Sequence, residues 1–550
     1  MPVWLGWARL AIGLAQGFGL YLIKDLKDHP HNALESGLWV TLWFVPVLII
    51  GSLGALRWLT LAVWATVAAL IAFGFAYYDI ARLGDAPRQI YGPQVIYLIV
   101  PAVLFIGHHL VAAGDEARRW IAPYERYFDL GWRHGAQVLL AVLFTGVFWL
   151  MLWLGAALFD LINLHFLRDL LQKEWFAFPA ICGAFAAAIH LTDLRSGLVR
   201  GARGLGLVLL SWLLPAMTLI AGAFILALPF TGLEPLWATR AATAILLSAA
   251  GALVVLINAA YQDGEHEPGL IRHWSARVAA VLLTPLAVLA AYALYLRIAQ
   301  YGLTPDRVYA FAVLVVGLCY AAAYTIGAFW PRWLKTLEIG NVVAAFVVIG
   351  VALLLFTPIA DPARLSVDNQ LARLRAGITR PDQFDVAFLR FDGAVYGQRA
   401  LEQLRADRST DTARQLGARA QRVTALDNQW EARDETIGAP MRVTMYPQGT
   451  QTPSGFIDSA PYSVASMCAR VDCDGFLVDV TNDGRNELIV GSGVFFVFTQ
   501  DEGHWRQIGS VQISGDQIEA MRAGHVRAAP AQISDLMFGE DRVPVRPDDR

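Results

Sequence analysis

Charged residues are scarce in this sequence. Only 16% of its 550 residues are Asp, Glu, Lys or Arg, whereas soluble globular proteins have about 25%. The mean hydropathy is +0.46. The formal net charge of −3 provides no basic excess of the kind that nucleic-acid binding needs. The scarcity of charge therefore indicates a membrane protein, with the lipid bilayer as its surroundings and without nucleic acid as a partner.

Lysine is absent from residues 359–550, where 21 Arg and 27 Asp or Glu give a formal net charge of −6. Residues 1–358 have a net charge of +3. Because this change of composition coincides with the end of the last long apolar run, we expect a domain boundary there. The sequence predicts a transmembrane helical domain over 1–358, an α+β domain over 359–539 and a flexible tail over 540–550.

The first apolar stretch lacks the features of a cleavable signal peptide. No basic run precedes it, Arg9 lies inside it, and no small-residue cleavage site follows at the right distance. Runs of about 20 apolar residues are long enough to cross a bilayer as helices. Eleven such runs are predicted, at 5–23, 38–56, 58–78, 93–113, 136–160, 175–192, 204–229, 238–258, 275–296, 308–330 and 340–358. The segment 175–192 is the shortest and contains Pro179 and Gly183, so it is either a full span or a re-entrant or broken helix.

Basic residues in the short loops favour a cytoplasmic N-terminus, with eleven Lys or Arg in the predicted cytoplasmic loops and eight in the opposite ones. The largest basic loop, DEARRWIAPYERYFDLGWRHG, interleaves tryptophan and tyrosine with its arginines, which is typical of an anchor at the inner leaflet. An odd number of spans then places the C-terminal domain outside the cytoplasm. The predicted location is the bacterial inner membrane with a periplasmic C-terminal domain.

The sequence contains only four cysteines. Cys182 and Cys319 lie in apolar runs and are predicted to be packing residues. Cys468 and Cys473 lie close together in the tail, where they form either a disulfide or two free thiols. An extracytoplasmic location favours the disulfide.

Ionisable and polar residues are rare inside the predicted spans, and such residues are candidates for function. They are Arg9, Gln16, His108, His109, His190 and Asp193. Arg9 and Gln16 are seven positions apart and therefore share a helix face. One interpretation is interfacial residues that pair with each other or with headgroups. The other is a polar cluster at the inner mouth of a pathway, with histidines that change charge near neutral pH. No acidic residue lies near the centre of a span, which disfavours a transporter driven by a carboxylate proton relay.

The tail has the pattern of an α+β domain. Leu365, Leu371 and Leu374 recur at helical spacing, and two further helices are predicted around ALEQL and TARQLGARAQRVTAL. Beyond residue 440, short runs of β-branched and aromatic residues predict strands at MRVTMY, GFLVDV, NELIVG, VFFVFT and WRQIGSV. The predicted fold class is an α-helical polytopic membrane bundle of about eleven transmembrane helices with a C-terminal soluble α+β domain ending in short antiparallel strands.

The order of these features resembles a bacterial multi-pass inner-membrane family known only as a domain of unknown function. The resemblance rests on the multi-pass bundle, on the membrane exit DPARLSVDNQLARLRAG and on the stretch FDVAFLRFDGAVYGQRALEQL. It implies a polytopic bundle with an extracytoplasmic tail. It implies no activity.

The stretch DVTNDGRNELIVG, residues 479–491, has the spacing of a small calcium loop. Its predicted ligands are Asp479, Thr481, Asp483, the Arg485 carbonyl and Glu487. It resembles the calcium loops of FG-GAP repeats, although Val490 stands where an EF-hand has its bidentate Glu. The competing interpretation is an empty β-hairpin turn, because Asp-Gly readily supplies positive φ. A bound calcium ion would be structural, and it is the only cofactor that the sequence suggests.

The sequence lacks a Walker loop, a GxSxG elbow, a dinucleotide-binding fingerprint and a clear inverted repeat. The leading hypothesis is therefore a non-enzymatic protein that binds, senses or scaffolds at the cell envelope through its C-terminal domain, with an envelope protein as partner. The alternative is a transporter or channel with the tail as a regulatory cap. An envelope-modifying enzyme is the least favoured hypothesis, because no acid/base constellation is present and no catalytic residue is assigned.

Overall fold

The computed structural model divides the chain into two compact units, residues 1–421 and 422–550. It describes residues 2–24, 32–84, 95–239, 241–262, 268–330, 333–426, 428–429, 432, 441–453, 455–501, 504–525, 536–538 and 541–543. The composition changes at residue 358, but the first compact unit continues to residue 421, so it includes the helices that follow the last span. The domain limits 359–539 and the tail 540–550 stay predictions.

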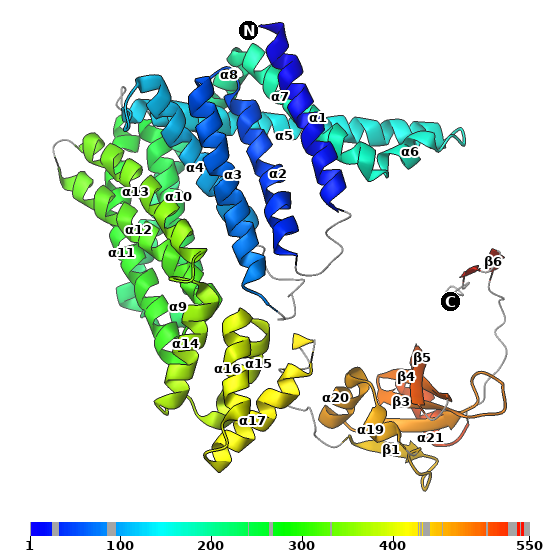
Figure 1. Cartoon of the computed structure of the whole chain (residues 1–550). Coiled ribbons are helices and arrows are strands. Elements are labelled where there is room, and N and C mark those ends of the chain that lie inside the picture. Colours follow the sequence, from blue (N-terminus) through cyan, green and yellow to red (C-terminus); the bar gives the residue numbers. More distant parts are fainter. Residues whose placement is uncertain are drawn as a thin grey trace. The chain divides into compact units, whose positions relative to one another are not determined.

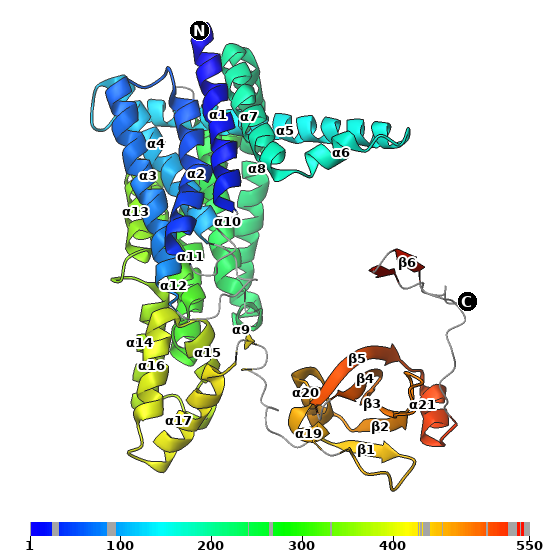
Figure 2. The same cartoon turned by 45° about the vertical axis from the view of Figure 1, so that its right-hand side comes forward.

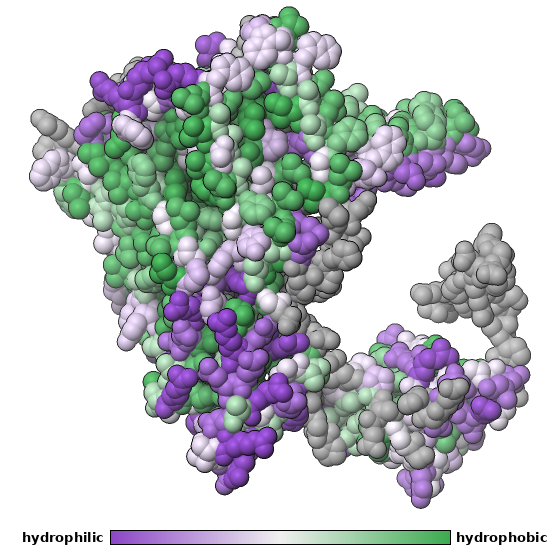
Figure 3. Space-filling view, in the orientation of Figure 1, coloured by the Kyte–Doolittle hydropathy of each residue, from purple (hydrophilic) through white to green (hydrophobic). Residues whose placement is uncertain are grey.

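The first unit is a bundle of long helices (Figure 1). Among the described residues, ten helices are long and apolar enough to cross a membrane. They are α2 (Ala33–Ser52), α3 (Trp58–Ala81), α4 (Ile96–Ala117), α5 (Tyr124–Asp160), α7 (Glu174–Leu194), α8 (Ser196–Thr231), α10 (Ala242–Tyr261), α11 (Leu270–Tyr301), α12 (Pro305–Phe329) and α13 (Trp333–Leu355). On the face that Figure 3 shows, apolar side chains cover the middle of the bundle and polar ones gather toward its two ends. The predicted class, a polytopic helical membrane bundle, is confirmed.

The remaining predicted span, 5–23, is the helix α1 (Val3–Lys24), which is long enough to cross a membrane but is not among these ten. It packs along α7, with glycines on the shared face. A Cβ at Gly17 would lie 2.3 Å from Cα of Pro179, and one at Gly13 would lie 2.7 Å from the Cys182 carbonyl oxygen. Small residues allow membrane helices to approach this closely. α7 is one continuous helix from Glu174 to Leu194 despite Pro179, so it is not a broken helix.

The predicted loop before the fifth span is largely helical, because α5 begins at Tyr124 and not near residue 136. Tyr124, Phe128 and Trp132 recur every fourth residue and contact one another in sequence as tilted ring pairs, with centroids 6.3 and 6.0 Å apart. This aromatic face packs against Leu207 and Ala259, which gives the segment a reason to be helical. The far end of α5 and the short α6 (Phe166–Leu171) stand away from the other helices in both views (Figures 1 and 2).

The helices α8 and α10–α13, with the short α9 (Glu234–Ala238), form the other part of the bundle. Their core consists of buried leucines and of small residues such as Ala276, Ala280 and Ala287. A closed ring of hydrogen bonds also lies within it. Asn341 donates to Tyr124 (3.0 Å) and Asn258 (2.9 Å), while Tyr324 accepts from Asn258 and donates to Asn341, both at 2.8 Å. The ring ties α5, α10, α12 and α13 together.

Four described helices and a 3-10 turn lie between the last span and the first strand of the second unit. They are α14 (Pro362–Arg375), the 3-10 turn (Pro381–Gln383), α15 (Val386–Phe391), α16 (Ala394–Ala406) and α17 (Asp411–Thr424). Asp361 is fully buried and caps α14 through the amide of Ala363. It also accepts from Tyr78 (2.7 Å) and pairs with Arg82 (3.2 Å) at the end of α3. Burial alone would lower the pKa of Arg82, but Asp79 and Asp361 beside it raise that pKa above its ordinary value. This segment is therefore anchored to the bundle.

The second unit is built on a five-stranded sheet in the order β1-β2-β3-β4-β5, and its β1–β2 pair is parallel. The strands are β1 (Val443–Tyr446), β2 (Cys473–Val478), β3 (Glu487–Ser492), β4 (Val494–Asp501) and β5 (His504–Gln512). The short helices are α19 (Phe456–Ser459), α20 (Tyr462–Arg470) and α21 (Gly515–Arg522), and a separate ribbon pairs β6 (Leu536–Phe538) with β7 (Asp541–Val543). The five predicted strands are confirmed. Each face of the sheet carries its own apolar cluster.

The cysteine pair in the second unit forms the predicted disulfide, Cys468–Cys473, with the two Cα atoms 5.3 Å apart. It joins the end of α20 to the first residue of β2, and both side chains are buried. The other two cysteines are free, as expected for packing residues in helices.

Candidate functional site

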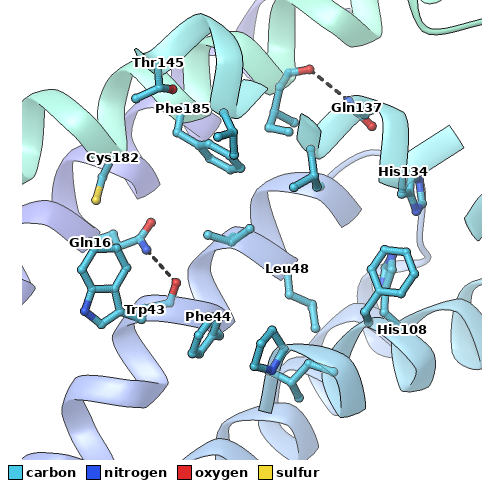
Figure 4. Close-up of a pocket in the computed structure, with 18 of the residues that line it drawn as sticks. Gln16, Trp43, Phe44, Leu48, His108, His134, Gln137, Thr145, Cys182 and Phe185 are labelled. Carbon is cyan, nitrogen blue, oxygen red and sulfur yellow. Dashed lines mark hydrogen bonds between the residues drawn. The ribbon is translucent and has the colours of Figure 1, made fainter. Parts of the chain in front are cut away.

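A cavity of about 710 Å³ lies inside the first unit between α1, α2, α4, α5 and α7 (Figure 4). Most of its wall is apolar, with side chains such as Trp43, Phe44, Leu48 and Phe185. Pro46, Pro101 and Pro179 interrupt the backbone hydrogen bonding of α2, α4 and α7. Three of the five helices around the cavity thus contain a proline, and α1 and α5 contain none.

Gln16 lines this cavity because of the proline in α2. A proline at position 46 has no N–H, so the Leu42 carbonyl four residues earlier has no partner within the helix. The Gln16 amide donates to Leu42 (2.9 Å) and to Trp43 (3.2 Å), and its side chain is buried. Within a membrane a side chain has to supply the missing hydrogen-bond donor, because no water is present to bond to a free carbonyl. Gln16 therefore has a structural role at one side of the cavity.

Three histidines lie at the opposite side, where His108 and His134 point toward the cavity (Figure 4). Nδ1 of His109 lies 2.6 Å from the Phe105 carbonyl and donates to it. In the neutral ring Nε2 is then an acceptor, and it lies 3.1 Å from Nδ1 of His134. The ring centroid of His108 is 5.3 Å from that of His109 and 5.5 Å from that of His134. Nδ1 of His108 is buried, and no described residue bonds to it.

A buried ion pair lies next to the cavity. Arg9 is 1% exposed, and its Nη2 lies 2.6 Å from a carboxylate oxygen of Asp193. Gln137, which lines the cavity, donates to the other oxygen of Asp193 at 2.9 Å and to the Ile189 carbonyl at 3.2 Å. Nη2 of Arg9 also donates to the Leu53 carbonyl at 3.0 Å. The charged groups are therefore paired behind the wall and do not face the cavity.

The six predicted intramembrane residues are thus distributed among three environments. Arg9 and Asp193 pair with each other, while Gln16, His108 and His109 line the cavity. His190 packs on α1 beside Gly6, and its Nδ1 has no partner among the residues that the structure describes. The sequence did not single out His134 and Gln137. His134 lies in the stretch that was interpreted as a loop, and recognising the aromatic spacing at 124, 128 and 132 would have placed it on the same helix as Gln137.

The predicted calcium loop joins β2 to β3 as residues 479–486, with positive φ at Asn482 (58°) and Gly484 (83°). Its carboxylates accept hydrogen bonds from the loop itself. Asp479 accepts from the amides of Asp483 (3.1 Å) and Gly484 (3.0 Å), and the buried Glu487 accepts from Val480 (2.8 Å). Thr481 and Arg485 also belong to these internal bonds, and Asp483 accepts from the Arg485 amide. Across the described part of the chain, no three His, Cys, Asp or Glu residues are grouped to hold a metal ion. Calcium binding stays a prediction.

Comparison with known proteins shows the family of this chain. Residues 36–394, more than half of the chain, match the model of a domain of unknown function, DUF4153. The chain belongs to this family, and the expected resemblance is confirmed. The matched range begins in α2 and ends at the start of α16, so it includes every described cavity element except α1. No curated protein and no solved structure matches the chain.

Proposed function

We propose that this integral membrane protein binds a lipid acyl chain in the cavity between α1, α2, α4, α5 and α7. It resides in the bacterial inner membrane, and its C-terminal unit lies outside the cytoplasm as a binding or sensing module for an envelope partner. The observation that carries the proposal is the cavity, whose volume of about 710 Å³ is within the range of ligand sites.

The lining of the cavity favours an acyl chain over a hydrated solute. Its polar side chains are few: two glutamines, one threonine, one cysteine and the histidines at one side. The glutamine amides already donate to backbone carbonyls, and the ion pair lies behind the wall. A transporter needs a polar path that replaces the hydration of its solute. An apolar space with a polar end suits a chain with a polar head.

Filling the cavity tests this proposal. Gly51 and Gly146 line it, and a Cβ built at either position meets nothing within 4 Å. Gly51→Leu and Gly146→Leu should therefore fill the space without a clash, and leucine also favours a helix over glycine. With the purified full-length protein, we expect binding of a fluorescent fatty-acyl probe to fall by about tenfold, the loss of a few buried methylenes.

Gly251→Leu is the matched control. Gly251 also lies in a membrane helix with open space at its Cβ position, and it does not line the cavity. This variant should bind the probe like the unaltered protein. Unchanged probe binding in both cavity variants would contradict the proposed function.

The proposed orientation rests on the disulfide and on the basic loops, since disulfides persist in oxidising compartments. Ser409→Cys and Trp120→Cys test it, because both positions are exposed and lie beyond opposite ends of α3 and α4. With Cys182 and Cys319 replaced by alanine, a membrane-impermeant maleimide on intact spheroplasts should label position 409 and not 120. The reverse pattern would place the C-terminal unit in the cytoplasm.

A further inference from the structure

A second cavity, of about 870 Å³, lies between α10, α11 and α12 and shares no lining residue with the first. Its polar side chains are Thr243, Ser248, Arg297, Asp306 and Arg307, and Tyr301 completes the wall. It is found where α11 ends and α12 begins, at one end of the membrane-spanning helices. This is the depth at which lipid headgroups meet a membrane protein.

Two guanidinium groups flank one aromatic ring in this cavity. Cζ of Arg297 is 6.0 Å and Cζ of Arg307 is 5.6 Å from the ring centroid of Tyr301, a cation–π arrangement for both. Arg297 donates one nitrogen to the Trp237 carbonyl at 2.7 Å, and Arg307 donates one to the Gly302 carbonyl. No carboxylate of a described residue forms an ion pair with either arginine. Each guanidinium has five N–H donors, so each keeps donors for a ligand.

The rigidity of this site comes from α14. Arg373 donates to the carbonyls of Ala299 and Gln300, both at 3.0 Å. Gln370 donates to the Tyr301 carbonyl at 2.9 Å. These bonds satisfy the last carbonyls of α11, which would otherwise lack partners. They fix the helix end that carries Arg297 and Tyr301.

We propose that this second cavity binds the phosphate of a phospholipid headgroup between Arg297 and Arg307. Two guanidiniums and the single carboxylate of Asp306 leave one positive charge, which a phosphodiester neutralises. Arginine binds phosphate through several parallel N–H bonds, and basic pockets between membrane helices are a known form of headgroup site. The alkyl chains extend along the apolar wall of Leu247, Leu294 and Val313. This site is independent of the acyl-chain cavity proposed above.

Lipid retention by the full-length protein tests the site. The full-length Gly146→Leu variant is used, because its first cavity is filled and only the second cavity can then retain lipid. It is purified, stripped of lipid, incubated with short-chain phosphatidylglycerol, phosphatidylethanolamine or diacylglycerol, and analysed by native mass spectrometry. We expect both phospholipids to be retained and diacylglycerol, which has no phosphate, to be lost. Arg297→Gln and Arg307→Gln should each lower phospholipid retention by about tenfold, the effect of losing one charge-assisted bond.

Arg272→Gln is the matched control, because Arg272 lies on the same helix at its opposite end, over the ring of Trp212. In the same Gly146→Leu background, it should leave phospholipid retention unchanged. If the arginine variants fail to fold, Ser248→Phe fills the second cavity, keeps both arginines and must lower phospholipid retention equally.

The comparison of the two phospholipids shows which part of the headgroup is bound. If phosphatidylethanolamine is retained better and Asp306→Asn removes this preference, Asp306 binds the amine. If both phospholipids are retained equally, the site recognises the phosphate alone. Equal retention of diacylglycerol, or unchanged retention in Arg297→Gln and Arg307→Gln, would overturn the proposal.

Discussion

Two groups of buried polar side chains lie in the bundle and differ in how completely they are bonded. The ring of Tyr124, Asn258, Tyr324 and Asn341 is closed, since each member bonds to at least two others. At the first cavity, Nδ1 of His108 is buried and has no partner among the described residues, and two nitrogens of Arg9 behind the cavity wall also lack one. One group has its bonds satisfied, and the other has donors or acceptors left over.

This difference separates a structural role from a role in binding. A buried polar group without a partner costs free energy, so it persists where something compensates for it. In a closed network every bond serves the fold, and interhelical hydrogen bonds hold membrane helices together. Where a polar atom without a partner faces a cavity, a ligand in that cavity can supply the missing hydrogen bond. The two groups should therefore respond differently to substitution.

The largest effect should come from breaking the ion pair of Arg9 and Asp193. Asp193→Ala leaves Arg9 as a buried, unpaired charge, which costs about 3–5 kcal/mol. Both side chains are less than a tenth exposed, so solvent cannot screen the loss. The measurement is thermal unfolding of the purified protein in detergent, where Tm should fall sharply.

Asp160→Ala is the control for this prediction. Asp160 pairs with Arg168 and contacts His165, but these side chains are partly exposed. Exposed pairs contribute less than about 1 kcal/mol, so Tm should barely change. Replacing both members of the buried pair, Arg9→Met with Asp193→Leu, should restore most of the lost stability. A fall in Tm in this double variant as large as in Asp193→Ala would show that the charge itself was not the cause.

The closed ring should give a smaller but clear loss of stability. Asn341→Ala removes bonds to three partners and leaves Tyr124 and Asn258 incompletely bonded. We expect a loss of about 1–2 kcal/mol in detergent, since interhelical hydrogen bonds contribute about that much or less. Acyl-probe binding should not change, because no member of the ring lines the first cavity. A loss of probe binding without a loss of stability would reverse the distinction between the two groups.

The sequence predicted the elements better than the contacts between them. All eleven apolar runs are helices, and the five strands lie where the β-branched runs are, because hydropathy and residue preference act locally. The start of α5 was missed, since its first three turns carry charges that resemble a loop. The spacing of Tyr124, Phe128 and Trp132 indicates a helix, but only the tertiary contacts show that this aromatic face packs against the bundle.

The candidate site was only partly predictable for the same reason. Rarity of polar residues in apolar runs identified Arg9 and Asp193, but their pairing depends on how α1 and α7 pack. Gln16 was a candidate functional residue in the sequence, but its amide donates to the Leu42 carbonyl, which has no partner within the helix because of Pro46. The first cavity cannot be derived from spacing, because it combines helices that are distant in the chain. Arg297, Tyr301 and Arg307 are close in the chain, but the cavity that they share also depends on how α10 packs against α11 and α12.

Replacing His108 should have an effect of the opposite sign from replacing Asn341. Nδ1 of His108 is buried without a described partner, so His108→Leu removes an unsatisfied polar atom. We expect stability to be unchanged or to rise by up to about 1 kcal/mol, while the affinity for an acyl probe with a polar head falls. Thermal unfolding and probe titration measure the two quantities on one preparation. A loss of stability comparable with that of Asn341→Ala would show that His108 is part of a satisfied network.

The smallest effect should be that of calcium on the loop between β2 and β3. Like the side chains of the closed ring, its carboxylates already have hydrogen-bond partners, because Asp479 and Glu487 accept N–H bonds from the loop. A calcium ion has to compete with these bonds, so we expect binding in the millimolar range and stabilisation below about 0.5 kcal/mol at millimolar calcium. Calorimetric titration of the full-length protein measures the binding, and Asp479→Ala with Asp483→Ala should abolish it. Equal binding after both substitutions would show that calcium binds elsewhere, and micromolar affinity would show that the loop gives up its internal bonds for the ion.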